Sequence, residues 1–166
     1  MIVLRDEMPG EGPALHALTD AAFKGKAFAD GTEGAIIGKL REAGDLLFSH
    51  VADAGAPVGH VALSPASIAG EGGWIGLGPI SVAPGHQKQG IGTRLMEAAI
   101  AFAKAQDGAK GIVLLGDPAY YGRFGFIAGS ALTFLDVPKA YVHYLRFTGA
   151  PPEGEVTFAP ALQEAG

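Results

Sequence analysis

The 166-residue sequence contains no cysteine, which excludes disulfides, thiolate metal sites and a cysteine nucleophile at once. The histidines are few, and none of them stand in the His-x-x-x-His spacing of a helical metal site. We therefore expect no metal. The five histidines are His16, His50, His60, His86 and His143.

Basic residues are also scarce. The chain has 12 Lys and Arg against 17 Asp and Glu, a net charge of −5, whereas a nucleic-acid partner calls for a basic surface. No apolar run approaches the length of a membrane span, and Arg5, Asp6 and Glu7 stand where a signal peptide would have its apolar core. We expect a cytoplasmic protein that binds neither nucleic acid nor membrane.

What the sequence does contain is typical of a globular protein. Hydrophobic residues make up 48% and charged residues 17%, and the length suits one domain, residues 1–166, with a substantial core. The 26 glycines and 11 prolines indicate many turns, without a repeat or a low-complexity tract.

The most informative stretch runs from Leu77 to Phe126. It predicts a strand (77–82), a glycine turn, a helix, and a short buried strand (111–116) followed by an aromatic turn. The helix has an apolar stripe with the spacing of one buried face. That stripe consists of Ile91, Leu95, Ala98, Ala99 and Phe102.

The glycine turn reads Gln87-x-x-Gly90-x-Gly92. Glycines at the opening of a helix let the backbone approach a ligand, and the free N–H groups there suit a phosphate or pyrophosphate. The alternative is that the glycines only allow close helix–strand packing. Two other phosphate motifs fail: Ile91-Gly92 replaces the Lys and Ser/Thr of a P-loop, and the third glycine of a dinucleotide fingerprint is missing.

These motifs resemble those of the GNAT acyltransferase superfamily. The glycine turn matches its coenzyme A pyrophosphate loop, and Tyr121-Gly-Arg-Phe-Gly-Phe126 matches its Y-x-x-x-G-F element. The segments VGHVALSP (58–65), LGPISVAP (77–84) and LGDPAYYGRFGF (115–126) are similar to the YhbS-like branch. The resemblance implies an α/β (α+β) GNAT fold: a mixed, mostly antiparallel sheet, splayed between strands 4 and 5 and flanked by helices.

The resemblance also implies an N-acetyltransferase that moves an acetyl group from acetyl-CoA directly to a primary amine. The partner would be a small-molecule or peptide amine, and the protein a monomer or a homodimer. An alternative is a non-catalytic sensor or partner module that holds an acyl-CoA in the same fold. A nucleotide-binding α/β module is disfavoured by the failed phosphate motifs.

The cofactor site is expected along the first strand and the glycine turn. Gly76, Gly78 and Pro79 are poor central-strand residues, and a bulge there would part the strand from its neighbour; the alternative is an ordinary edge strand. Pantetheine would lie in that opening, where backbone N–H groups polarise the thioester carbonyl. The expected cofactor-binding residues are Ile80, Ser81, Val82, Gln87, Lys88, Gln89, Gly90, Ile91, Gly92, Thr93 and Arg94.

Tyr121 matches the family's general-acid tyrosine, which would protonate the leaving thiolate; the alternative is a core aromatic, as we expect for Tyr120. Glu33 matches an acidic position of the YhbS-like pattern and is the candidate base, although Asp30-x-x-Glu33 also reads as a capping box. Asp117 and His60 rank behind it as bases, and Asp117 before Pro118 can instead cap a short helix.

The remaining segments predict further elements around this stretch. We expect helices over 13–23 and up to 43, a loop over 24–31 that borders the acceptor site in the GNAT fold, and a glycine-rich turn over 69–73. Expected strands cover 2–5, 46–53, 57–65, 131–137, 140–147 and 156–158. Four aromatic residues could line an acceptor pocket or belong to the core: Phe134, Tyr141, Tyr144 and Phe147.

Overall fold

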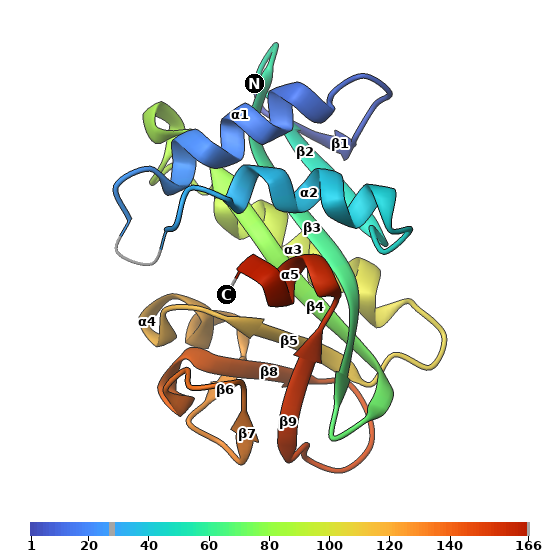
Figure 1. Ribbon diagram of the computed structural model, residues 1–166. Coiled ribbons are helices and arrows are strands. Elements are labelled where there is room, and N and C mark those ends of the chain that lie inside the picture. The colour runs from blue at the N-terminus through green and yellow to red at the C-terminus, as the bar shows by residue number, and fades with distance from the viewer. Residues whose placement is uncertain (27–28, 166) are drawn as a thin grey trace.

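The computed structural model describes residues 1–26 and 29–165, and in this part of the chain a nine-stranded sheet lies between helices (Figure 1). The strands are β1 (Val3–Asp6), β2 (Phe48–Asp53), β3 (Pro57–Ile68), β4 (Glu71–Val82), β5 (Gly111–Leu115), β6 (Ile127–Ala128), β7 (Leu132–Thr133), β8 (Val142–Arg146) and β9 (Gly154–Phe158). The α-helices are α1 (Gly12–Phe23), α2 (Glu33–Glu42), α3 (Ile91–Lys104), α4 (Pro118–Tyr121) and α5 (Pro160–Ala165). Short 3-10 turns are η1 (Pro84–His86), η2 (Gly122–Phe124) and η3 (Lys139–Tyr141).

The main path of the sheet has the order β1-β2-β3-β4-β5-β8-β6. All neighbours on this path are antiparallel except β4 and β5, which are parallel. The last strand, β9, pairs with the far end of β3 and also with β7. The architecture is therefore the mixed, mostly antiparallel sheet that the sequence predicts.

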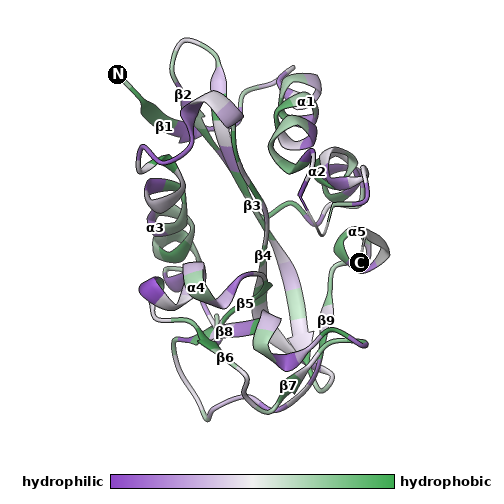
Figure 2. Cartoon of the chain, turned by 90° about the vertical axis from the view of Figure 1, so that its left-hand side faces the viewer, coloured by the Kyte–Doolittle hydropathy of each residue, from purple (hydrophilic) through white to green (hydrophobic). Residues whose placement is uncertain are grey.

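The two faces of the sheet are covered by different helices. In Figure 2, α3 lies on one side of β3 and β4, and α1 and α2 lie on the other. A side chain at Gly59 of β3 would meet Ile91 and Leu95 at 3.0 Å, so the absence of one lets α3 pack closely on its face. On the opposite face Val51 of β2 packs against Leu15 of α1, among others.

The strands β4 and β5 separate halfway along β4. Their pairing consists of Trp74 with Gly111, Ile75 with Ile112, and Gly76 with Val113. On its other side β4 stays paired with β3, but the register shifts so that Gly78 and Pro79 together oppose one residue of β3. This is the bulge expected at Gly78-Pro79, and beyond Gly76 the two parallel strands are splayed.

Several element boundaries differ from the sequence prediction. The expected turn over 69–73 is a two-residue hairpin turn, because Ala69 and Gly70 both have positive φ (51° and 80°) and β4 then begins at Glu71. The strand expected over 131–137 is reduced to β7, since Leu135 has a φ of 47° and the chain reverses there. The short elements β6 and α5 were not expected. Within the predicted loop over 24–31, residues 27 and 28 lie outside the described part.

Two of the four aromatic residues considered for an acceptor pocket are core residues. Phe134 and Tyr144 are 1% and 7% exposed and pack in one cluster with Trp74 and Phe158. No helix formed by residues 1–26 and 29–165 is long and apolar enough to cross a membrane.

Candidate functional site

The glycine turn leads directly into the first turn of α3. Gly90 precedes the helix with a left-handed φ of 82°, and Lys88 before it also has a positive φ of 63°. Because the first backbone hydrogen bond of α3 runs from the Arg94 N–H to the Gly90 carbonyl, the preceding N–H groups have no partner within the helix. These amides sit at the positive end of the helix dipole, which favours an anion.

Gly92 also has a packing role. A side chain there would lie 2.9 Å from the hydroxyl oxygen of Tyr120, so the absence of one brings α4 against the first turn of α3. The Arg123 guanidinium stacks 4.4 Å above the Tyr120 ring and its Nε donates to the Tyr120 carbonyl at 3.1 Å. Tyr120, which we expected to be a core aromatic, and Arg123, which the sequence analysis did not assign, thus lie beside the glycine turn.

Two polar side chains of the turn are already bonded to protein. Gln87 Nε2 donates to the Val82 carbonyl at 3.1 Å, which holds the turn to the end of β4. Arg94 Nη1 donates to the Ile2 carbonyl at 3.1 Å, so this guanidinium ties α3 to the N-terminal segment. Lys88 is exposed and is the better placed of the two expected cations to meet a phosphate.

The free edge of β4 offers backbone groups to the opening. The Ala83 N–H donates to the Val58 carbonyl of β3 at 2.8 Å. Because alternate residues of an extended strand direct their N–H groups to opposite sides, Val82 and Ile80 direct theirs away from β3, toward the splayed side. The Ser81 side chain is 3% exposed and, as the register partner of His60, lies on the face covered by α1.

Tyr121 packs at the end of β5. Its ring lies so close to Gly116 that any side chain there would overlap it, and it also contacts His143 and Phe126, with ring centroids 5.5 and 6.1 Å away. Burial raises the pKa of Tyr121 to about 12, so the phenol stays protonated at neutral pH. A protonated, partly buried phenol beside the opening can donate a hydrogen bond to a leaving group.

His143 of β8 was missed by the sequence analysis. Its Nε2 lies 2.9 Å from the Gly116 carbonyl oxygen, and since a carbonyl only accepts, Nε2 carries the hydrogen. The imidazole therefore fixes the turn on which Tyr121 packs. No local signal pointed to it, because β8 pairing alone brings His143 beside Tyr121.

Two of the candidate bases, Glu33 and Asp117, accept hydrogen bonds from backbone N–H groups near the start of a helix. Glu33 accepts from the Asp30 and Gly31 N–H groups at 2.9 and 3.2 Å, which are the contacts of a helix cap. Asp117 accepts from the Ala119 N–H at 2.9 Å, so its capping role is confirmed. Glu33 in α2 and Tyr121 in α4 come from helices on opposite sides of β4 (Figure 2).

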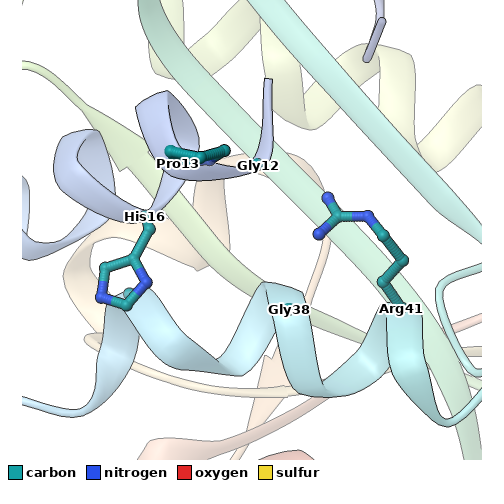
Figure 3. Close-up of a pocket in the computed structure, with 6 residues that line it drawn as sticks. Gly12, Pro13, His16, Gly38 and Arg41 are labelled. Carbon is teal, nitrogen blue, oxygen red and sulfur yellow. The ribbon is translucent and has the colours of Figure 1, made fainter. Parts of the chain in front are cut away.

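A hollow of about 430 Å³ lies between α1 and α2 (Figure 3), and its lining includes Gly34, which follows Glu33 in α2. Its polar side chains are His16 and Arg41, which pair with Asp20 and Glu7 at 3.2 and 2.5 Å. In the described part of the chain, no three His, Asp or Glu side chains are grouped so that they could hold a metal ion.

Comparison with known proteins gives a consistent result. The sequence profile of the acetyltransferase (GNAT) family matches residues 13–126. The uncharacterized N-acetyltransferase YhbS of Escherichia coli strain K12 is 34% identical over 128 residues, which cover 75% of this chain and 73% of that protein.

Two crystal structures are similar along nearly the whole chain. A GNAT family acetyltransferase from Brucella melitensis in complex with acetyl-CoA is 38% identical, with a TM-score of 0.85 and 98% of each chain covered. YhbS from Escherichia coli in complex with CoA is 28% identical, with a TM-score of 0.88, covering 99% of this chain and 93% of that one.

Proposed function

The chain belongs to the acetyltransferase (GNAT) family, and from that premise we propose that it transfers an acetyl group from acetyl-CoA directly to a primary amine. The observation that carries this proposal is the splayed pair β4 and β5 with the N-terminus of α3 at its end. An extended pantetheine arm fits the first feature, and a pyrophosphate fits the second.

Acetyl-CoA serves as the co-substrate, as the complexes of the Brucella and Escherichia coli relatives support. The amides of residues 87–93 hold the pyrophosphate, and Lys88 meets a phosphate. Pantetheine runs beside Ile80, Ser81 and Val82, and the outward N–H groups of Ile80 and Val82 bond its amides and polarise the thioester carbonyl. Arg94 positions α3 through its bond to the Ile2 carbonyl.

The reaction needs a neutral amine, a stabilised oxyanion and a leaving thiolate. The amine nitrogen attacks the thioester carbon, and the tetrahedral oxyanion receives hydrogen bonds from the free β4 edge. Tyr121 donates its phenolic hydrogen toward the departing sulfur. Because a thiol has a pKa of ~8.5 and the pKa of Tyr121 is raised to about 12, the phenol is the weaker acid of the two. Its contribution is therefore a hydrogen bond to the developing thiolate more than an early proton transfer.

Glu33 is the base that the family pattern suggests, and it remains a proposed candidate. Both of its carboxylate oxygens accept backbone N–H groups at the start of α2. These two bonds hold the carboxylate in the position of a helix cap, which argues for a route that leaves Glu33 as a cap.

The test compares Tyr121→Phe with Tyr120→Phe in acetyl transfer to a panel of spermidine, L-lysine, tyramine and a tetrapeptide with a free amino terminus. General-acid assistance contributes about 10²–10⁴-fold, and since a thiolate leaves readily we expect a loss near 10² for Tyr121→Phe, with unchanged acetyl-CoA affinity. Tyr120→Phe should stay within about threefold of the parent.

Three results would count against the proposal. Equal rates for Tyr121→Phe and the parent, with chemistry rate-limiting, would reassign Tyr121 to packing. A loss confined to cofactor affinity would do the same. Tight acetyl-CoA binding without transfer to any amine of the panel would favour the non-catalytic acyl-CoA-binding module instead.

A further inference from the structure

A continuous chain of hydrogen bonds connects the middle of the sheet with its edge. Ser49 Oγ lies 2.5 Å from Glu7 Oε1 and 2.7 Å from His60 Nε2. His60 is fully buried in β3, Ser49 stands in the neighbouring β2, and Glu7 follows β1. None of these three residues has a role in cofactor binding or in the action of Tyr121.

The donors in this chain can be assigned from chemistry alone. Glu7 also lies 2.5 Å from Arg41 Nη2, so its carboxylate is an ion-pair partner and acts as an acceptor. Ser49 must then donate its single hydrogen to Glu7. What remains on Ser49 Oγ is a lone pair, so His60 Nε2 must carry a hydrogen and donate to it.

The other imidazole nitrogen of His60 is consequently an unprotonated acceptor. It is buried, and no donor reaches it from the described residues. Desolvation lowers the pKa of His60 to about 4, which keeps the ring neutral at physiological pH. The charged groups that face it are Glu7 and Glu11, which raise its pKa, and Arg41 and His50, which lower it.

Among the described residues, three further buried hydroxyls without partners lie on the same covered face, those of Thr19, Ser64 and Ser81. Ser81 of β4 is the register partner of His60, so their Cβ atoms are ~5 Å apart. Thr19 is fully buried on α1, which covers this face. An unsatisfied buried polar atom costs ~1–3 kcal/mol, and a bound water with two to four polar partners relieves such a cost.

Ser81 connects this cluster with the opening. It belongs to the segment of β4 that lies beyond the Gly78-Pro79 bulge and has no β5 partner. The unprotonated Nδ1 of His60 therefore lies one strand away from the place where the amine would lose its proton.

We propose that Glu7, Ser49 and His60 form a proton relay that carries the proton of the acceptor amine from the opening beside β4 to the protein surface. The relay rests on the proposed acetyl transfer and supplies its missing proton path. Entry is through the Ser81 hydroxyl or a water bound between Ser81 and His60, so His60 acts through these groups and is a positioning residue.

The proton balance of the relay is closed. As the N–C bond forms and the C–S bond breaks, the amine proton reaches His60 Nδ1, the Nε2 hydrogen passes to Ser49 Oγ, and the Ser49 hydrogen passes to Glu7. Glu7 lines a surface hollow of about 280 Å³ and releases the proton to water there. The thiolate, stabilised by the hydrogen bond from Tyr121, takes a proton from water in place of the one that Glu7 releases, so no net proton is gained or lost.

The test uses Ser49→Ala, which interrupts the relay in its middle, and Ser49→Thr, which keeps a hydroxyl. The control is Ser64→Ala, because Ser64 is a fully buried serine of this face, in β3, and stands outside the relay. The measurements are acetyl-CoA affinity, thermal unfolding, and kcat from pH 6 to 10 with the fastest acceptor of the amine panel above.

We expect Ser49→Ala to lower kcat about 10–100-fold at pH 7 without changing acetyl-CoA affinity, and the deficit to shrink toward pH 10, where the amine is neutral without help. Ser49→Thr should recover most of the rate and Ser64→Ala should match the parent. A Ser49→Ala profile equal to that of the parent would overturn the relay, as would an equal loss at every pH in Ser49→Ala and Ser49→Thr.

The imidazole ¹⁵N spectrum of His60 tests the relay independently of turnover. It should show hydrogen on Nε2 and a bare Nδ1 at pH 7, and hydrogen on Nδ1 would overturn the relay. A parent that transfers acetyl to none of the amines would refute the proposed function, and the relay with it. A parent that transfers normally while Ser49→Ala keeps the parent profile would refute the relay alone.

Discussion

The two faces of the β3–β4 pair are built from different chemistry. On the α3 face the side chains are apolar, with Ile91 and Leu95 packed over Gly59, and the polar groups are backbone amides at the helix end and the strand edge. On the α1 face the buried layer includes polar side chains, His60 and Ser81 among them. We infer that the first face binds the cofactor through its backbone and the second handles the proton through its side chains.

The polar groups of the two faces also differ in how much they destabilise the folded state. Amides at the exposed start of a helix are hydrated before a ligand arrives, so they cost little. Each buried polar atom without a hydrogen-bond partner, by contrast, destabilises the fold by ~1–3 kcal/mol. The rule that buried polar atoms are hydrogen-bonded tends to be broken at functional sites. Substitutions on the α3 face should therefore change binding, whereas those on the α1 face should change pH dependence.

The largest effect on acetyl-CoA affinity is expected when a negative charge is introduced at the glycine turn. Gly92→Glu places a carboxylate among the amides proposed for the pyrophosphate, and like charges ~4 Å apart repel by about 4 kcal/mol at an effective dielectric constant of ~20. After allowance for exposure we expect acetyl-CoA affinity to fall about 100-fold or more by isothermal titration calorimetry.

Gly92→Gln is the matched control, because it fills the same space near the Tyr120 hydroxyl without the charge. Gly92→Gln should bind acetyl-CoA at least about tenfold more tightly than Gly92→Glu does. This difference in affinity should become smaller in 1 M salt, where the Debye length is ~3 Å. Parent-like affinity in both variants would remove the pyrophosphate from this turn.

The second-largest effect is expected on the α1 face, where burial of His60 should make the free energy of unfolding depend on pH. The pKa of His60 is lowered to about 4 in the folded state against an unfolded value of ~6.5, so between these values the unfolded chain binds more protons and stability rises with pH. We expect the free energy of unfolding to fall by about 2 kcal/mol from pH 7 to 4.5, measured by urea denaturation.

His60→Gln should flatten this pH dependence, since a glutamine can still donate to Ser49 but does not titrate. The same slope in His60→Gln and the parent would assign the effect to other groups. It would also remove the evidence that the imidazole is buried in its neutral form.

The smallest effect is expected at Glu33. Glu33→Gln keeps one accepting oxygen but loses the charge and one of two capping bonds, so it should destabilise the fold by about 0.5–1 kcal/mol. The rate of acetyl transfer should stay within about threefold of the parent. A 100-fold loss of kcat with an intact fold would make Glu33 the base and would contradict the division of labour between the faces.

The face that we propose for the cofactor could be predicted from the sequence because its signals are local. The glycine spacing of 90 and 92 lies within one helix start, and the bulge at Gly78-Pro79 was predicted from residue type together with the family resemblance. The β3–β4 turn, expected over 69–73, was predicted too long, because Ala69 adopts a positive φ that alanine seldom takes and completes a two-residue turn with Gly70.

The α1 face could not be read in the same way. Glu7 and Ser49 are separated by 42 positions, and only the pairing of β1 with β2 brings them together. His60 faces Ser49 through the β2–β3 register, and a one-residue slip would place it on the α3 face. Long-range register is a property of the folded sheet, so no local pattern carries it.

A crystal structure of the parent with acetyl-CoA tests the central claim most directly. The account predicts the pyrophosphate on the amides of residues 87–93, pantetheine beside Ile80 and Val82, and the thioester sulfur near the Tyr121 hydroxyl, with the α1 face free of cofactor. Cofactor density on the α1 face, or a pyrophosphate away from the start of α3, would contradict it.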